Sequence, residues 1–108
     1  ISGIYDLVPL ISTSLNINIK LDSSQARENS PILRVSDDLV PAEFFVGSYE
    51  TEAFIQQSQK MKEQWEFKGN LANFRVLKDS DHFSLLFHFL RNGEIVKSIE
   101  RLYTSTNI

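Results

Sequence analysis

The chain has 108 residues, of which 42% are hydrophobic and 23% are charged, a composition typical of one globular domain. The 11 basic and 14 acidic residues give a formal net charge of −3, and no basic block suggests a nucleic-acid-binding surface. No apolar run approaches the roughly 18 residues of a membrane span. The absence of cysteine excludes disulfides and thiolate zinc sites, and it fits the reducing cytoplasm as the expected location.

The first twenty residues predict short elements. Residues 1–5 predict the end of a buried strand, in which Gly3 permits a close approach of the backbone. Residues 6–12 predict a short helical turn with Pro9 near its start. Residues 13–20 are polar and rich in asparagine, so they predict a loop.

A second short helix is expected over residues 23–29. Asp22 is followed three residues later by Gln25, which resembles a capping box at a helix start. Pro31 ends this helix because it disfavours the helical conformation at the preceding residue. Residues 36–41 then predict a polar turn with a solvated acidic pair, Asp37 and Asp38.

The middle of the chain predicts a strand, a long helix and a second strand. Residues 43–47 are aromatic and β-branched, which favours a buried strand ending at Gly47. Residues 52–67 predict a helix with Thr51 as its N-cap and Gly69 as its stop signal. Its core-facing stripe, at three- and four-residue spacing, contains Phe54, Ile55, Ser58, Met61, Lys62 and Trp65. Residues 73–77 alternate and predict the second strand.

The last third of the chain predicts a polar loop and two helices. The loop spans residues 78–82, and apolar side chains at Phe83, Leu86, Phe87 and Leu90 predict a helix that Asn92 and Gly93 end. Residues 95–103 predict a final amphipathic helix. The order of elements favours an α/β fold with a right-handed crossover between parallel strands. Both strands then end at one edge of the sheet, where ligands bind in open α/β folds.

Glu50 and His82 follow the two predicted strands, by three and five residues respectively. They are therefore expected to meet at the same edge. A carboxylate that accepts a hydrogen bond from one imidazole nitrogen leaves the other nitrogen free to take a proton. This pair would be the acid and base of a Ser–His–acid system, and the acid precedes the histidine as in α/β-hydrolases.

Other interpretations of these residues stay open. Glu52 is a competing acid, although a helix N-terminus favours acidic residues in any protein. A single histidine in a loop, such as His82, is commonly a surface residue. His88 lies six residues further on, whereas a two-histidine metal site on a helix needs a spacing of four, so no metal site is expected. Asp79 and Asp81 are expected to shape the loop before His82.

Four segments, spread over residues 1 to about 90, resemble the kynurenine formamidase (arylformamidase) family. They are residues 2–7 (SGIYDL), 26–31 (ARENSP), 46–54 (VGSYETEAF, continuing to Gln57 and Ser58) and 81–83 (DHF). The resemblance implies the C-terminal part of an α/β-hydrolase fold, with His82 as general base. It puts the triad acid at Glu50, where the family usually has aspartate.

The resemblance also implies that the nucleophile lies upstream of Ile1, in a larger protein. The family's Gly-x-Ser-x-Gly and His-Gly-Gly motifs do not occur in these 108 residues, and Ser2, Ser12 and Ser14 lie in no such context. The expected partners are the substrate and the remainder of the same polypeptide, with a homodimer as a further possibility. The isolated chain is expected to be inactive and prone to aggregate.

The implied reaction is the hydrolysis of N-formyl-L-kynurenine to L-kynurenine and formate, a step of tryptophan degradation, without a metal or organic cofactor. Two alternatives remain at this point. One is a different α/β-hydrolase, such as a carboxylesterase or peptidase. The other is a non-catalytic α/β binding domain or a degenerate relative of the hydrolases.

Overall fold

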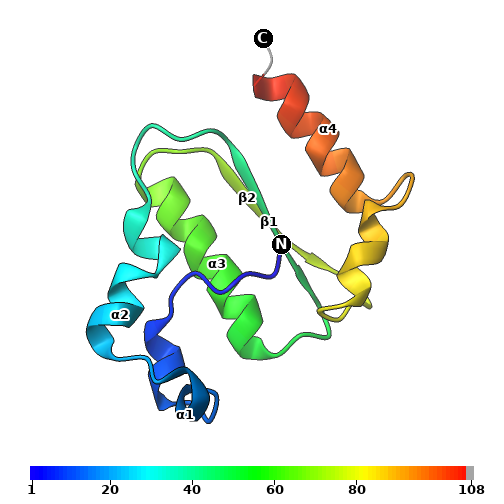
Figure 1. Cartoon of the computed structure of the whole chain (residues 1–108). Coiled ribbons are helices and arrows are strands. Elements are labelled where there is room, and N and C mark those ends of the chain that lie inside the picture. Colours follow the sequence, from blue (N-terminus) through cyan, green and yellow to red (C-terminus); the bar gives the residue numbers. More distant parts are fainter. Residues whose placement is uncertain (107–108) are drawn as a thin grey trace.

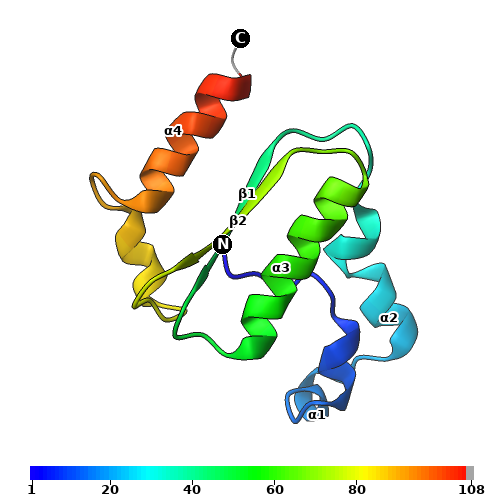
Figure 2. The same ribbon diagram turned by 180° about the vertical axis from the view of Figure 1, so that it is seen from behind.

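The computed structural model describes residues 1–106, and residues 107–108 lie outside the described part. Its elements run in the order η1 (Val8–Ser12), α1 (Asn16–Ile19), α2 (Ser23–Glu28), η2 (Pro31–Arg34), β1 (Ala42–Gly47), α3 (Glu52–Phe67), β2 (Ala72–Leu77), η3 (Ser84–Phe89) and α4 (Glu94–Thr106). The described residues therefore form an α/β arrangement, in which α1 and α2 lie far from α4 (Figures 1 and 2).

β1 and β2 form a two-stranded parallel sheet, in which Ala42 lies opposite Ala72 and Gly47 opposite Leu77. Helix α3 connects the two strands. This confirms the predicted strand–helix–strand unit, and α3 has the predicted bounds. Because the strands are parallel, the loops that follow them leave from the same edge of the sheet.

The face of the sheet that carries Phe44 packs against α3. Phe44 lies in a cluster with Met61 of α3, and its ring contacts those of Trp65 and Tyr5 edge-on, with centroids 5.9 Å apart in each pair. Successive side chains of a strand point to opposite faces, so Phe44 and Phe45 serve different layers. Met61 is buried in this core and the half-buried Trp65 packs against it, as the helical stripe predicted.

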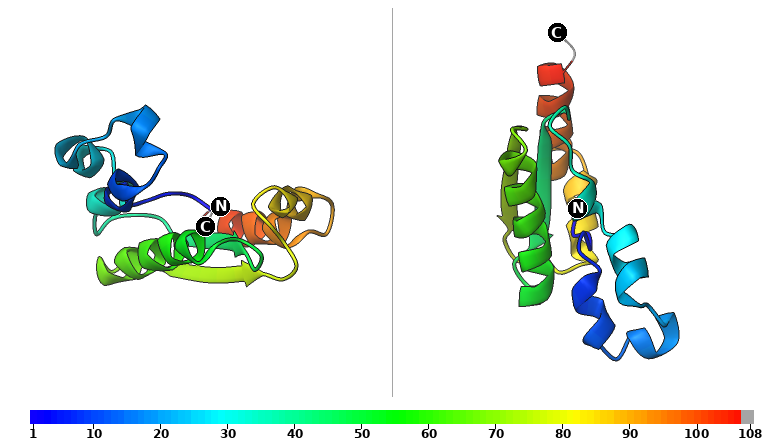
Figure 3. Two further views of the ribbon diagram at one scale, coloured as in Figure 1. Left: turned by 90° about the horizontal axis from the view of Figure 1, so that it is seen from below. Right: turned by 90° about the vertical axis from the view of Figure 1, so that its left-hand side faces the viewer.

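The opposite face of the sheet packs against η3 and α4. Phe45 and Leu77 form a buried cluster there with Leu85 of η3 and Ile95 of α4. On the same face, the Glu43 carboxylate accepts hydrogen bonds from Ser98 and Arg101 of α4. Two layers thus cover the strands, with α3 on one side and η3 with α4 on the other (Figure 3).

The N-terminal segment differs from its prediction. Residues 1–5 form no strand, so that prediction is wrong. Ser2 has a φ of 45°, and its N–H makes one backbone hydrogen bond, to the Phe45 carbonyl at 2.7 Å. A left-handed residue cannot continue a regular ladder, so the chain turns away from β1 after this contact. Gly3 does allow a close approach, because the Tyr5 ring occupies the place where a β-carbon at position 3 would lie.

The region around α1 and α2 follows its prediction in part. The capping box of α2 is confirmed, since the Asp22 carboxylate accepts from the Gln25 N–H and the Gln25 side chain accepts from the Asp22 N–H. The predicted loop over residues 13–20 contains one helical turn, α1. The Asn16 side chain closes this turn through hydrogen bonds to the backbone of Ile11 and Leu21.

Two helix details also differ. Thr51 occupies the N-cap position of α3, but its side chain makes no capping hydrogen bond. The helix predicted over residues 83–90 is the 3-10 helix η3, in which Leu85 is buried. Phe89 and four further apolar side chains around η3 are exposed, and we call these four the outer η3 surface: Phe83, Leu86, Phe87 and Leu90.

The helices of residues 1–106 include none with both the length and the apolar character needed to cross a membrane.

Candidate active site

The loops that follow β1 and β2 are bonded to each other. The Tyr49 N–H donates to the Ser80 carbonyl at 3.0 Å, and the Asp79 N–H donates to the Ser48 hydroxyl at 2.9 Å. Gly47 makes this approach possible, because a β-carbon at position 47 would lie 2.0 Å from the Ser80 carbonyl oxygen. The end of β1 therefore requires glycine for the two loops to meet.

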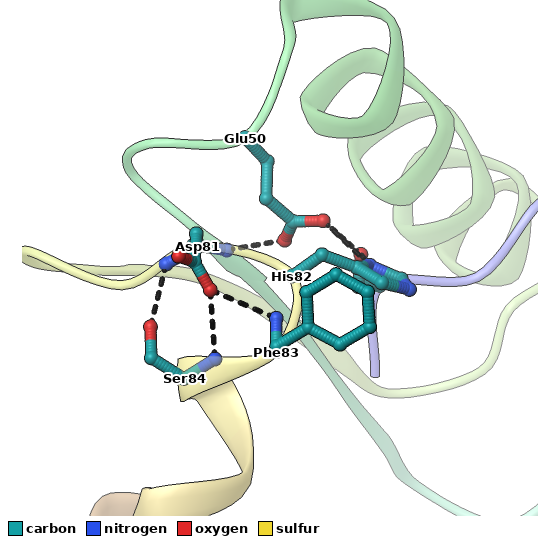
Figure 4. A network of polar contacts seen from close by, with 7 residues as sticks. Glu50, Asp81, His82, Phe83 and Ser84 are labelled. Atoms are coloured by element: carbon teal, nitrogen blue, oxygen red, sulfur yellow. Dashed lines mark hydrogen bonds and ion pairs between the residues drawn. The ribbon is translucent and has the colours of Figure 1, made fainter.

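Glu50 and His82 meet between these loops, as their positions after the strands predicted. Glu50 Oε1 lies 2.8 Å from His82 Nδ1 (Figure 4). The Glu50 side chain is 1% exposed and the His82 side chain 48% exposed. The carboxylate is thus enclosed while the imidazole reaches the surface. The hydrogen bonds of His82 within the described residues use Nδ1, which leaves Nε2 available to another group.

Ser2 joins this pair, and the sequence did not predict it as part of the site. Its hydroxyl lies 2.5 Å from Glu50 Oε1 and 2.9 Å from His82 Nδ1. In the sequence Ser2 is a candidate only for the nucleophile, and it lacks the Gly-x-Ser-x-Gly context of one. The one available signal was its place in the SGIYDL segment, next to a glycine, but nothing local relates position 2 to position 50.

The second oxygen of Glu50 is also bonded, since the Gly47 N–H donates to Oε2 at 2.7 Å. Burial by itself raises the pKa of the Glu50 carboxyl. The hydrogen bonds from the Gly47 N–H, the Ser2 hydroxyl and His82 outweigh burial, so its pKa lies below the ordinary value of 4.5. Glu50 is therefore held as a carboxylate, the form that can accept a hydrogen bond from a protonated imidazole nitrogen.

Asp81 shapes the loop before His82, as predicted. Its Oδ1 accepts the N–H groups of Phe83 at 2.9 Å and Ser84 at 2.8 Å, and the Asp81 N–H donates to the Ser84 hydroxyl (Figure 4). The bonds from Ser84 and Phe83 lower the pKa of the Asp81 carboxyl. Asp79 takes a left-handed conformation with a φ of 57° and accepts a hydrogen bond from the Tyr49 hydroxyl. The carboxylates of Asp79 and Asp81 thus bond other groups of the loops, and the carboxylate that bonds the His82 ring is that of Glu50.

Aromatic rings stand on two sides of the imidazole. The Phe54 ring centroid lies 5.2 Å from that of His82, and the Phe83 centroid lies 5.5 Å away. An open pocket of about 280 Å³ adjoins them, lined by Tyr49, Glu50, Thr51, Phe54, Asp81, His82 and Phe83. The pocket therefore combines the aromatic side chains of Tyr49, Phe54 and Phe83 with polar groups, among them the exposed imidazole of His82.

The competing residues lie elsewhere. Glu52 begins α3 and accepts a hydrogen bond from Gln56 on its own helix. His88 bonds the Ser80 hydroxyl through Nε2 at 3.0 Å, so it supports the loop and is no part of the pair. Among residues 1–106, no group of three or more His, Cys, Asp or Glu side chains is placed to hold a metal ion.

Comparison with known proteins finds similarity to a kynurenine formamidase. No family model matches the sequence, and no solved structure matches it. The chain is 32% identical over 91 residues to kynurenine formamidase of Danio rerio, an alignment that covers 80% of this chain and 31% of the relative. The chain thus spans about a third of the length of that protein. This similarity confirms the resemblance to kynurenine formamidase that the four sequence segments predicted.

Proposed function

We propose that the chain forms the C-terminal part of an α/β-hydrolase domain and supplies the acid and base of a serine-type formamidase. The observation that carries the proposal is the 2.8 Å contact between Glu50 Oε1 and His82 Nδ1, made by loops that follow neighbouring parallel strands. The similarity to kynurenine formamidase favours N-formyl-L-kynurenine as the substrate, with L-kynurenine and formate as the products.

In the proposed mechanism a serine outside these 108 residues attacks the formyl carbonyl. His82 Nε2 takes the proton of that serine and then delivers it to the aniline nitrogen, which leaves as the amine of L-kynurenine. Water, activated by the same imidazole, releases formate from the serine ester. Glu50 holds Nδ1 as the donor nitrogen and stabilises the imidazolium in both steps. None of these steps needs a metal or an organic cofactor.

The rest of the polypeptide would supply what this chain does not. Each strand of the sheet has one edge without a partner strand within the described residues, and the outer η3 surface is apolar and exposed. Exposed edges and apolar patches favour association. We therefore expect the isolated chain to be inactive and to aggregate, which light scattering would detect. A monomeric chain with a sharp, cooperative melt would contradict this expectation.

The test uses the full-length protein that carries this chain. The assay is done either in cells that express the protein in their cytoplasm or with the purified protein. The test follows the formation of L-kynurenine and formate from N-formyl-L-kynurenine. His82→Ala is expected to lower kcat by about 10⁶-fold, the effect of losing the base of a triad. His88→Ala is the matched control, because this histidine contacts Ser80 and not Glu50; it should keep most of the activity.

A fluorophosphonate probe, which reacts with activated serines, adds a second readout. It should label a serine outside residues 1–108 in the wild type, and labelling should fall in His82→Ala. Hydrolysis of aryl esters without hydrolysis of N-formyl-L-kynurenine would point to another α/β-hydrolase. Unchanged biological activity of His82→Ala would instead point to a non-catalytic protein.

A further inference from the structure

The pair formed by Glu50 and His82 has a third member that comes from the start of the chain. Ser2 is buried, and its backbone N–H is bonded to the carbonyl of Phe45 in the middle of β1. Ser2 has a φ of 45°, and its side chain reaches Glu50 and His82 in the two loops. The left-handed conformation is uncommon for a serine, and here it accompanies two contacts with the proposed catalytic groups.

The donor and acceptor roles of these contacts follow from the chemistry of the groups. An ionised carboxylate only accepts, so the Ser2 hydroxyl donates to Glu50 Oε1 over 2.5 Å. The His82 Nδ1–H donates to the same oxygen over 2.8 Å. The 2.9 Å between Nδ1 and the Ser2 oxygen makes that oxygen a second acceptor for the same N–H. With the Gly47 N–H on Oε2, three donors hold the carboxylate.

The same geometry argues against Ser2 as the nucleophile. A nucleophilic serine gives its proton to the imidazole nitrogen that faces away from the acid. Ser2 instead lies on the Nδ1 side, where Glu50 already binds. Its hydroxyl hydrogen is directed to the carboxylate and not to Nε2. Ser2 therefore acts on the acid and, through it, on the histidine.

We propose that Ser2 is a positioning residue that fixes the Glu50 carboxylate so that Oε1 faces His82 Nδ1. This inference deepens the proposed function and rests on it. A glutamate has one more rotatable bond than an aspartate, so its carboxylate has more orientations to lose when it is held in place. The Ser2 hydroxyl and the Gly47 N–H each bind one of its oxygens and restrict that freedom. A hydrogen bond to a charged acceptor is stronger than one between neutral groups.

The experiment compares Ser2→Ala with wild type in the full-length protein, using N-formyl-L-kynurenine as substrate. Ser2→Ala should lower kcat by about 10-fold, with KM nearly unchanged, since the lost bond acts on the charged state of the pair. In a Glu50→Gln background the same substitution should change kcat by less than about 2-fold, because the group that Ser2 positions is already altered.

Ser98→Ala is the matched control. Ser98 is also buried and also donates to a carboxylate, that of Glu43, on the face of the sheet covered by α4. Ser98→Ala removes the same kind of hydrogen bond, but at a place remote from His82. The substitution can lower stability and should leave kcat unchanged. If Ser2→Ala and Ser98→Ala lower kcat and the melting temperature in parallel, Ser2 is merely structural and the proposal is wrong.

A readout independent of turnover separates this proposal from the proposed function. The low-field proton resonance of the His82 Nδ1–H reports its bond to Glu50 directly. It should shift or broaden in Ser2→Ala and stay unchanged in Ser98→Ala, even if N-formyl-L-kynurenine is no substrate. An unshifted resonance in Ser2→Ala would overturn the positioning role. Complete loss of activity with a fluorophosphonate label on Ser2 would overturn it too, in favour of a nucleophile.

Discussion

The loops after the two strands and the outer η3 surface involve neighbouring parts of the chain, yet they differ in how far their side chains are paired within it. The two loops are joined by hydrogen bonds. Some are between backbone groups, such as Tyr49 N–H to the Ser80 carbonyl, and one is between the side chains of Glu50 and His82. The outer η3 surface exposes apolar rings and leucines to solvent. The loops after the strands, which we call the polar edge, are thus bonded to each other within the chain. In the outer η3 surface the Phe83 ring contacts His82, and all four side chains remain exposed.

The largest expected effect comes from the polar edge. Gly47→Ala would put a β-carbon 2.0 Å from the Ser80 carbonyl oxygen, so one loop must move. We expect a loss of about 3 kcal/mol or more in unfolding free energy, since backbone rather than a flexible side chain is displaced. Urea unfolding measures the loss. Gly69→Ala is the control, because it has open space around it and only backbone strain to overcome. Equal losses for both variants would contradict the argument.

The next largest effect is a difference in unfolding free energy between substitutions of two adjacent leucines in η3. Leu85 is 1% exposed and packs with Phe45, whereas Leu86 is 62% exposed. In the full-length protein Leu85→Ala should cost about 2.5 kcal/mol of unfolding free energy, because it opens a cavity among buried side chains. Leu86→Ala should cost more than the roughly 0.5 kcal/mol typical of an exposed site, because the proposed remainder of the polypeptide covers the outer η3 surface. A loss below about 0.5 kcal/mol for Leu86→Ala would argue against that cover.

A smaller effect concerns the pH dependence of stability. The folded-state pKa of Glu50 is lowered, so its contribution is present above the unfolded value of 4.5 and is lost as the pH falls through the folded value. Unfolding free energy should therefore decline from about pH 4.5 downward. Glu50→Gln should be less stable at neutral pH and should show a shallower decline. The decline does not vanish, because the pKa values of Asp81 and Glu94 are lowered as well. Identical slopes for variant and wild type would rule out this role of Glu50.

The smallest effect lies at the exposed rim of the polar edge. The hydrogen bond from the Tyr49 hydroxyl to the Asp79 carboxylate raises the pKa of the phenol above its ordinary value of 10.0. Asp79→Asn keeps a residue that tolerates the left-handed backbone but removes the charge. The phenol should then titrate closer to 10.0, as ultraviolet absorbance would show, with little change in stability. A phenol that titrates unchanged would mean that the bond does not persist in solution.

Local patterns predicted the central unit well. The aromatic strand ending at Gly47, the helical stripe of α3 and the alternation of β2 each depend on residues that are close in the sequence. The contact of Glu50 with His82 could also be predicted, because parallel strands must end at the same edge. The role of Asp81 followed from its place directly before the histidine.

The N-terminal segment shows where such prediction ends. The apolar and glycine residues at its start are typical of a strand, but a single left-handed residue, Ser2, converts the segment into one anchored turn. That conformation is stabilised by contacts with Phe45 and Glu50, which are more than forty positions away. No pattern within the first five residues contains this information.

The amino-acid sequence alone thus determined the parallel strand–helix–strand unit, because periodicity acts over neighbouring residues. It also determined the meeting of an acid with an imidazole, because parallel strands end at the same edge of a sheet. Only the tertiary structure decided that Ser2 completes the pair and that Leu85, rather than the more regular apolar stripe beside it, enters the core. Both outcomes depend on which distant groups compete for the same space and the same hydrogen bonds, and that competition exists only once the layers have packed.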